Sequence, residues 1–333
     1  MTTTAAPAHL HDGYQTGART MRVVEVRPLT DAITHFRFAP IDGTLTPYQP
    51  GSHLIVQAGA TRNAYSLVDD GMYPDSYGIS VLRKDTGGGS QWLHTNLVEG
   101  ELVEIEGPRP MFAPVLDQHR ALLVAGGIGI TPILSHARAA AREGLPVEVV
   151  YSYRPGQGAH LDDLRALADL SDVTVYEATS VDETIELLTK RLAAQPLGTH
   201  AYACGPAPLL DSYTRLASAA GWPAARVHLE RFTAPEQDPG DPFTVSLADG
   251  TAIDVPPGVS LLERLLDNGV DVGNMCRQGV CGECRIPVRA GAITHRDYVL
   301  SDDEKAAGDA MLCCVSRGAG DLILDVARPA PPS

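Results

Sequence analysis

Three of the six cysteines lie within nine residues near the C-terminus, in the segment NMCRQGVCGECRIP that spans 274–287. They are Cys276, Cys281 and Cys284, and two glycines lie between them. A disulfide framework would require export, and the N-terminal sequence MTTTAAPAHLHDG has neither the basic nor the apolar region of a secretory signal. The thiols are therefore expected to stay reduced in a cytoplasmic protein, where crowded cysteines favour metal binding.

The spacing C-x4-C-x2-C, with a further cysteine far downstream, is that of plant-type [2Fe–2S] sites. Two irons need four thiolates, and a loop can supply three of them when glycines such as Gly279 and Gly282 allow unusual backbone angles. The N–H groups of such a loop also approach the sulfides and tune the reduction potential. The predicted metal ligands are Cys276, Cys281, Cys284 and Cys314.

A zinc site and simple burial are the two alternatives for these cysteines. A structural zinc site also uses four cysteines, but it favours two short C-x2-C hairpins, and only one such pair occurs here. Burial of unliganded thiols is disfavoured, because a glycine-rich loop is a poor place to bury them. Cys313 is an alternative fourth ligand; otherwise it is expected to be a small core residue.

The 333 residues are too many for one ordinary core, so two or three domains are expected. The net charge of −15 argues against nucleic acid and anionic membranes as partners. No apolar run reaches about 18 residues, so no transmembrane helix is expected.

Changes in sequence pattern divide the chain. Residues 18–115 carry short β-rich runs separated by Gly and Pro turns, which predicts a small antiparallel β-barrel. Residues 116–232 alternate strands with helices, which predicts an α/β doubly wound sheet with ligands at the carboxyl ends of its strands. Residues 1–17 are expected to be a disordered tail.

The C-terminal third begins after a stretch rich in Pro, Gly and acid at 233–241, which is expected to be a linker. In residues 242–329, a hairpin is predicted around Asp249–Gly250, followed by a helix with Ser260 as its N-cap. The acidic run SDDE at 301–304 is either a docking patch for a basic partner or an ordinary helix start, where the dipole favours acids.

Two glycine-containing segments lie at strand ends in the α/β part. GGIGITP at 126–132 follows a strand and precedes a helix, so its glycines and the helix N-terminus suit a pyrophosphate, although a tight turn without a ligand is the alternative. The pattern is not GxGxxG, which disfavours an ordinary Rossmann dehydrogenase. YACGP at 202–206 ends a later strand at the same sheet edge, and by itself Cys204 is explained as a small buried residue.

In the barrel part, the segment RNAYSLV carries Arg62, Tyr65 and Ser66 on one strand. A tyrosine ring can pack against an isoalloxazine, and Arg and Ser can bind phosphate. The motif is weak alone, because tyrosine and arginine are common on exposed strands.

Taken together, the segments resemble the phthalate dioxygenase reductase family, to which vanillate demethylase reductase is closely related. The resemblance covers residues 18–329 and implies the order flavin-binding β-barrel, NAD-binding domain and plant-type ferredoxin domain of the β-grasp, α+β type. The motifs that carry it, besides the cysteines, are RNAYSL, GGS at Gly88–Ser90, GPRPMFAP, GGIGITP, CGP and HLERF.

The family implies FMN, NADH as substrate and a [2Fe–2S] cluster, with FAD as the alternative flavin. It assigns the flavin contacts to Arg62, Asn63, Ala64, Tyr65, Ser66, Gly88, Gly89 and Ser90. It places Gly127 and Thr131 at the NADH pyrophosphate or the flavin edge. It places Cys204, Gly205 and Pro206 in the nicotinamide pocket, and Phe232 at the flavin–nicotinamide contact.

One residue departs from the family pattern Arg-x-Tyr-Ser. The arginine is at Arg62, one position early, and Asn63 stands in its usual place. A shift of one residue on a strand points a side chain to the opposite face. The phosphate contact is therefore open between a displaced Arg62 and a neutral hydrogen bond from Asn63.

The resemblance implies an NADH-dependent reductase that passes electrons through FMN and the cluster to a terminal oxygenase, expected to be a Rieske non-haem iron oxygenase or demethylase. No catalytic side chain is expected, because the cofactors perform the hydride and electron transfer. The alternatives are an FAD-containing reductase for a di-iron hydroxylase or a cytochrome P450, and a flavin and iron–sulfur redox sensor. No nucleic-acid or membrane partner is expected.

Overall fold

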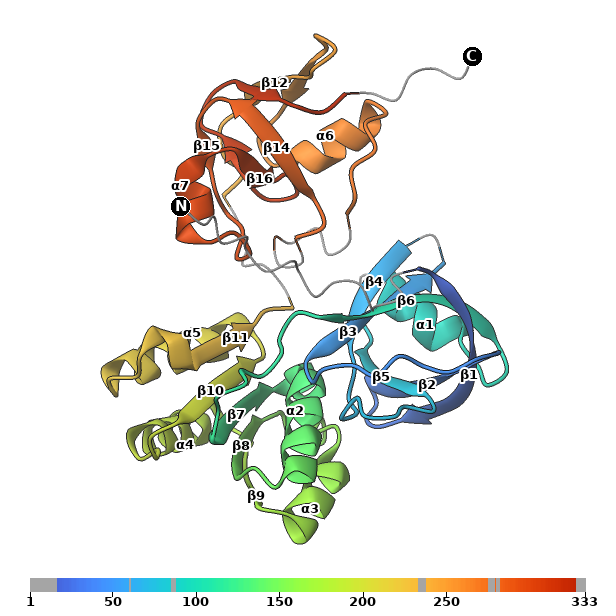
Figure 1. The fold of residues 1–333 in the computed structure, drawn as a ribbon, viewed down its shortest axis with the longest axis vertical. Coiled ribbons are helices and arrows are strands. Elements are labelled where there is room, and N and C mark those ends of the chain that lie inside the picture. Colours follow the sequence, from blue (N-terminus) through green and yellow to red (C-terminus); the bar gives the residue numbers. More distant parts are fainter. Residues whose placement is uncertain are drawn as a thin grey trace, which may run out of the picture. The chain divides into compact units, whose positions relative to one another are not determined.

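The computed structural model describes residues 17–59, 61–84, 88–232, 238–274, 279 and 282–327. The chain divides into two compact units, Met1–Glu230 and Arg231–Ser333 (Figure 1). The expected tail and the first part of the expected linker, 233–237, lie outside the described residues, apart from Gly17 in the tail. Within the described part of the chain, no helix is long and apolar enough to cross a membrane.

The first unit begins with a six-stranded antiparallel sheet of order β4-β3-β6-β1-β2-β5. The sheet curls, because an isolated bridge between Leu67 and Ile79 joins the chain after β4 to β5. One side chain of α1, Leu93, is buried in the core of this sheet. The elements are β1 (Arg19–Pro28), β2 (Ile33–Pro40), β3 (Ser52–Ala58), β4 (Thr61–Ser66), β5 (Tyr77–Leu82), α1 (Gly89–Asn96) and β6 (Leu102–Pro110).

The rest of the first unit is a five-stranded parallel sheet of order β11-β10-β7-β8-β9. Its central strands are almost wholly buried, as expected for a parallel sheet with helices on both faces (Figure 1). The strands are β7 (Arg120–Gly126), β8 (Val147–Ser152), β9 (Val173–Ala178), β10 (Thr199–Cys204) and β11 (Val227–Glu230). The helices are α2 (Ile130–Glu143), α3 (Leu161–Leu170), α4 (Val181–Ala193) and α5 (Ala207–Ala219), with 3-10 turns η1 (Gly127–Gly129) and η2 (Ala224–Arg226).

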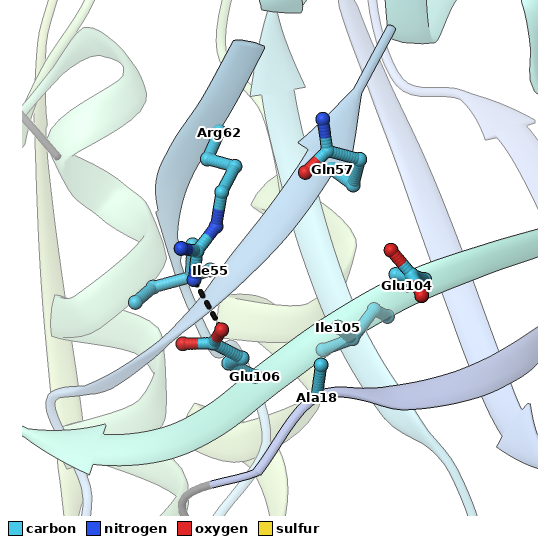
Figure 2. Close-up of a pocket in the computed structure, with 7 residues that line it drawn as sticks. All are labelled: Ala18, Ile55, Gln57, Arg62, Glu104, Ile105 and Glu106. Atoms are coloured by element: carbon cyan, nitrogen blue, oxygen red, sulfur yellow. Dashed lines mark ion pairs between the residues drawn. The ribbon is translucent and has the colours of Figure 1, made fainter. Parts of the chain in front are cut away.

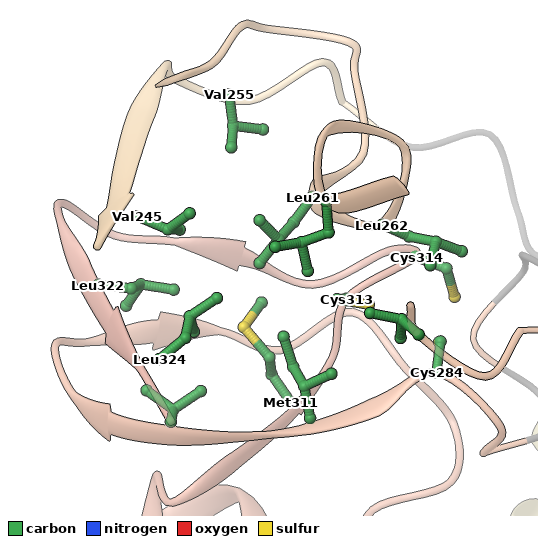
Figure 3. Close-up of a cluster of buried hydrophobic side chains, with 14 of the residues drawn as sticks. Val245, Val255, Leu261, Leu262, Cys284, Met311, Cys313, Cys314, Leu322 and Leu324 are labelled. Atoms are coloured by element: carbon green, nitrogen blue, oxygen red, sulfur yellow. The ribbon is translucent and has the colours of Figure 1, made fainter. Parts of the chain in front are cut away.

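The second unit is a five-stranded mixed sheet of order β13-β12-β18-β14-β16 with a small two-stranded sheet beside it. Its core brings Leu261 and Leu262 of α6 against the inner side chains of the sheet (Figure 3). The elements are β12 (Phe243–Ser246), β13 (Ala252–Val255), α6 (Leu261–Asp267), β14 (Arg285–Ala290), β15 (Ile293–Thr294), α7 (Asp302–Ala307), β16 (Ala310–Leu312), β17 (Arg317–Gly318) and β18 (Leu322–Leu324).

Three local predictions for the second unit can be compared with the structure. The hairpin around Asp249–Gly250 is confirmed, because β12 and β13 pair antiparallel on either side of it. Ser260 is the N-cap of α6, and its hydroxyl accepts the Glu263 N–H at 3.1 Å. The acids of SDDE begin α7, where Ser301 and Glu304 form a capping box. The prediction of a helix start at that acidic run is therefore confirmed.

Candidate functional site

The two glycine-containing segments pack against each other at the carboxyl ends of the neighbouring strands β7 and β10. A Cβ atom built on Gly129 would lie 2.2 Å from the carbonyl oxygen of Cys204. A Cβ on Gly126 would lie 2.7 Å from Cδ of Pro206. A side chain at Gly129 would require the Cys204 backbone to move, and one at Gly126 would require the Pro206 ring and the Leu209 side chain to move. Two segments that lie far apart in sequence therefore form one surface, called here the glycine edge: Gly126–Gly129 with Cys204–Pro206.

Two predicted residues at this edge, Gly127 and Thr131, differ in their accessibility to a ligand. Gly127 has φ of +53°, and a Cβ built on it would meet nothing within 4 Å, so its backbone is accessible to a ligand. Thr131 is buried, and its hydroxyl donates to the Ile128 carbonyl at 3.0 Å. The hydroxyl thus stabilises the turn into α2, whose N-terminus faces the carboxyl side of the sheet, where a pyrophosphate would bind.

Beside the glycine edge, Cys204 is fully buried next to Glu230, its register partner at the end of β11. Burial raises the pKa of the Cys204 thiol, and the Glu230 carboxyl raises it further. Burial also raises the pKa of Glu230, to about 8, although a hydrogen bond with Cys204 opposes this. Glu230 is a candidate residue that the sequence analysis missed. Its only sequence signal was its place in HLERF, two residues before the predicted Phe232, which is half-buried in the second unit.

The predicted flavin residues of β4 point to opposite faces of the sheet. A Cβ built on Gly89 would lie 2.2 Å from Oδ1 of Asn63, so Asn63 lies against the N-terminus of α1. Gly88, with φ of +87°, is the N-cap there and supplies no side chain. Asn63, Gly88 and Gly89 are thereby brought together. The Ser90 hydroxyl, at the same helix start, accepts the backbone N–H of Lys84 at 3.3 Å.

Tyr65 lies on the same face of β4 as Asn63, two residues further on. Its hydroxyl is buried and has no hydrogen-bond partner among the described residues, and burial raises its pKa. An orphaned buried hydroxyl fits a site completed by a bound molecule. Ala64 is exposed, and Ser66 is buried opposite His53 of β3, whose Nε2 also lacks a partner within the described chain. These residues fit a flavin.

Figure 2 shows Arg62 pointing toward Glu106 of β6, whereas the next residue, Asn63, lies against α1. Its guanidinium forms an ion pair with Glu106 of β6, which also pairs with Arg109 at 3.1 Å. A cavity of about 160 Å³ lies beside Arg62. Its lining residues are Ala18, Ile55, Gln57, Arg62, Glu104, Ile105 and Glu106. The structure therefore does not bring Arg62 together with Asn63, Tyr65 and the α1 N-terminus.

Of the predicted cluster ligands, Cys276 and Cys281 lie outside the described residues, whereas Cys284 and Cys314 are brought together (Figure 3). Hydrogen bonds from the thiols of Cys313 and Cys314 lower the pKa of Cys284 to about 3, against the effect of burial. Three thiols within hydrogen-bonding reach of one another fit a shared metal site. Cys313 is fully buried and Cys314 is 7% exposed, so burial does not distinguish between them. Both thiols remain candidates for the fourth cluster ligand.

The glycines of the cysteine loop adopt the predicted backbone. Gly279 has φ of +71° and Gly282 has φ of +81°, a region that side chains rarely allow. A Cβ on Gly279 would also lie 2.6 Å from the Val315 side chain. The described part of the loop is therefore shaped as a tight ligand loop requires.

Comparisons with known proteins agree with this geometry. Residues 246–317 match the model of the 2Fe-2S iron-sulfur cluster binding domain, and residues 109–227 match that of the dimethylamine monooxygenase subunit DmmA-like, N-terminal domain. The heme-dependent oxidative N-demethylase beta subunit of Ectopseudomonas mendocina is 39% identical over 91% of this chain and 97% of its own length. Phthalate dioxygenase reductase of Burkholderia cepacia is 36% identical over 86% of this chain and 90% of its own.

A solved structure shows the same architecture along nearly the whole chain. Phthalate dioxygenase reductase, whose structure is described as modular for electron transfer from pyridine nucleotides to [2Fe–2S], superposes with a TM-score of 0.71 at 33% identity. The match covers 94% of this chain and 98% of that one. The fold and site thus define an iron–sulfur flavoprotein oxidoreductase that uses pyridine nucleotides. The chain belongs to the phthalate dioxygenase reductase family, which includes reductase subunits of multicomponent oxygenases.

Proposed function

We propose that this chain is the reductase component of a multicomponent oxygenase and carries electrons from NADH through FMN and a [2Fe–2S] cluster to a terminal oxygenase. The observation that carries the proposal is the glycine edge, where Gly129 and Cys204 leave room for no side chain between them. Such an edge, in a chain that also carries the cysteine set, suits pyridine-nucleotide oxidation coupled to electron export. The proposed domains are a flavin-binding barrel at 18–115, an NAD-binding domain at 116–232 and a β-grasp ferredoxin domain at 242–329, with a linker at 233–241.

In the nucleotide site, the accessible backbone of Gly127 and the start of α2 would hold the pyrophosphate of NADH. Cys204, Gly205 and Pro206 would line the nicotinamide pocket, and Phe232 would contact the flavin and nicotinamide rings. Support comes from the packing of the two segments into one surface. Cys204 is buried within this surface and Glu230 is half-buried beside it, and the protonated forms that burial favours would keep the surface uncharged.

In the flavin site, Tyr65 would pack against the isoalloxazine and Ser66 would lie near it. Gly88, Gly89 and Ser90 would hold the phosphate with the N–H groups of the α1 N-terminus. Asn63, rather than Arg62, would add a neutral hydrogen bond there, because Asn63 lies against Gly89 and Arg62 pairs with Glu106.

When bound, the flavin supplies the conversion of one hydride into two single electrons. The residues of this chain would bind and orient the partners of that exchange and exclude water from it. Cys276, Cys281, Cys284 and Cys314 would hold the cluster that receives the electrons, and the protein around them would set its potential.

A terminal oxygenase is the proposed acceptor, and a Rieske non-haem iron enzyme is the first candidate. A haem-dependent oxygenase is the second. It is favoured by the relative that is named as a subunit of a heme-dependent oxidative N-demethylase, and by the match of 109–227 to a dimethylamine monooxygenase subunit model. Steady-state reduction of each purified oxygenase type by this protein and NADH would separate the two.

The cofactor proposal is tested on the purified full-length protein. We expect two irons and two acid-labile sulfides per chain, a flavin identified as FMN by mass spectrometry after release, and NADH-dependent reduction of cytochrome c. A matched variant, Cys284→Ser, should lose the iron and the cytochrome c activity while it keeps the flavin and reduces ferricyanide with NADH. A colourless protein that contains zinc and no iron would contradict the proposal.

A further inference from the structure

Asp297 is a buried carboxylate in the loop before α7. Its side chain is 0% exposed. Oδ2 accepts the backbone N–H groups of Leu300 at 2.8 Å and Val299 at 3.2 Å, and Oδ1 accepts the hydroxyl of Ser316 at 3.3 Å. A charge this deep is costly unless donors surround it, and three donors do so here.

The same loop is tied to the cysteine loop. The N–H of Tyr298 donates to the carbonyl of Gly279 at 2.9 Å, and a Cβ built on Gly279 would lie 3.2 Å from Cα of Asp297. Gly279 lies between Cys276 and Cys281, and Ser316 lies two residues after Cys314. Asp297 therefore contacts both chain segments that carry the proposed ligands.

Two other ionisable groups face Asp297. Nδ1 of His295 lies 3.6 Å from Oδ1, and both ring nitrogens of His295 are buried without a hydrogen-bond partner within the described chain. Nζ of Lys305 donates to the backbone carbonyl of Asp297 at 2.9 Å rather than to the carboxylate. The donors to the carboxylate oxygens are thus neutral N–H and O–H groups.

We propose that Asp297 is a positioning residue for the [2Fe–2S] site, which joins the cysteine loop to the Cys314 segment, and that its fixed negative charge lowers the reduction potential of the cluster. The inference rests on the proposed function, because it requires a cluster at these cysteines. A buried negative charge opposes the addition of an electron nearby, and screening by water is weak in such a place. One side chain then influences both the reduction potential of the cluster and the placement of the two segments that carry its ligands.

The test is a potentiometric titration of the purified holoenzyme, with the cluster followed by EPR and the flavin by absorbance. Asp297→Asn keeps the shape and the acceptor oxygen but removes the charge. We expect full iron and sulfide content, an upward shift of the cluster potential and an unchanged flavin potential. The matched control is Asp303→Asn, an exposed acid of α7. Its charge is screened by solvent, so its shift should be clearly smaller.

A second variant covers the case in which Asp297→Asn fails to assemble the cluster. Ser316→Ala removes one donor and leaves the charge less compensated, so the cluster potential should move downward. An Asp297→Asn protein with full iron and the wild-type potential would overturn the inference, as would an unchanged potential in Ser316→Ala when Asp297→Asn lacks iron. Wild-type protein without iron would instead defeat the proposed function.

Discussion

The guanidinium of Arg138 on α2 lies 2.8 Å from the carboxylate of Asp69, measured from Nη1 to Oδ1. Asp69 follows β4, so this ion pair joins the α/β layer to the curled antiparallel sheet. Nη2 of Arg138 also binds Asp163 at 2.6 Å, and the side chains of Arg138 and Asp69 are each 22% exposed. One cation shared by two carboxylates thus holds the two sheets of the first unit against each other.

Replacing Arg138 by methionine should destabilise the first unit. The variant Arg138→Met keeps the aliphatic packing but leaves Asp69 with Arg37 alone and Asp163 with His160 alone. We expect a cost of about 1–3 kcal/mol, between the values for exposed and buried pairs. Urea unfolding monitored by tryptophan fluorescence measures this loss of unfolding free energy. The control is Arg165→Ala, a residue that is 56% exposed, for which a change within about 0.5 kcal/mol is expected. Equal losses for both variants would show that the bridge contributes little.

A hydrogen-bonded chain runs from Asp163 to His35 across the same boundary. Nδ1 of His160 donates to Asp163 at 2.6 Å, and Nε2 of the same ring lies 2.8 Å from the hydroxyl of Ser80. The Ser80 hydroxyl in turn lies 3.0 Å from Nδ1 of His35. Burial lowers the pKa of His35 from 6.5 to about 3, and His160 lowers it further. Burial would raise the pKa of Asp163, but the hydrogen bond from His160 and the charge of Arg138 bring it down to about 2.

Acid should therefore destabilise the protein through His35. Its folded-state pKa is lowered, so the unfolded state binds more protons below pH 6.5, and stability falls as the pH drops from 6.5 toward 3. In His35→Gln, the loss of unfolding free energy between pH 7 and pH 4 should be smaller than in the wild type. Denaturant unfolding at several pH values measures this slope. His119→Gln, at an exposed position, should leave the slope unchanged; a matching decrease there would refute the assignment to His35.

The glycine edge predicts a large effect from one methyl group. In Gly129→Ala, the new Cβ would lie 2.2 Å from the Cys204 carbonyl, so one strand end must move. We expect the KM for NADH to rise at least tenfold, measured by ferricyanide reduction. Gly144→Ala is the control: its φ of +68° makes alanine cost about 1 kcal/mol of stability, but no atom lies within 4 Å of the new Cβ. Its KM for NADH should stay at the wild-type value.

The fourth cluster ligand can be assigned by two serine variants. Cys314→Ser should lose the cluster, and Cys313→Ser should keep it, as the match of the spacing to plant-type sites predicts. Iron content and the visible absorption of the purified variants measure the outcome. Loss of iron only in Cys313→Ser would move the ligand to Cys313, which is also beside Cys284.

The two neighbouring residues of β4 should differ in their effect on the flavin. Asn63→Ala should weaken FMN binding about tenfold, the value of one hydrogen bond to a charged group. Arg62→Ala should change the affinity by less than about twofold, because its partner is Glu106. Fluorescence titration of the deflavinated protein with FMN measures both. A larger loss in Arg62→Ala would identify the arginine as the phosphate ligand.

Local patterns predicted much of this fold, because they depend on residues close in sequence. Strand–helix alternation, the Ser260 cap and the positive φ of Gly279 each follow from a few neighbouring residues. The one-residue shift at Arg62 also predicted correctly that its side chain faces away from Asn63.

Relations between distant segments were not predictable in the same way. The pairing of Arg62 with Glu106 and the position of Glu230 beside Cys204 both depend on strand pairing that one sequence does not specify. Asp297 lies in a segment that looks like an ordinary turn in the sequence, and only the fold brings it to Gly279 and Ser316. The adjacent Cys313 and Cys314 differ in sequence spacing, but the structure brings both thiols to Cys284.

The pairing of Arg62 with Glu106 has a consequence for how the protein retains its flavin. Arg62 is the sole cation of β4, and its charge is used on the face away from Asn63. If backbone N–H groups and an amide hold the phosphate without a guanidinium, there is little long-range electrostatic attraction for dissolved ions to screen. Retention of the flavin on a desalting column should then vary little with ionic strength, unlike that of flavoproteins whose phosphate is bound by arginine.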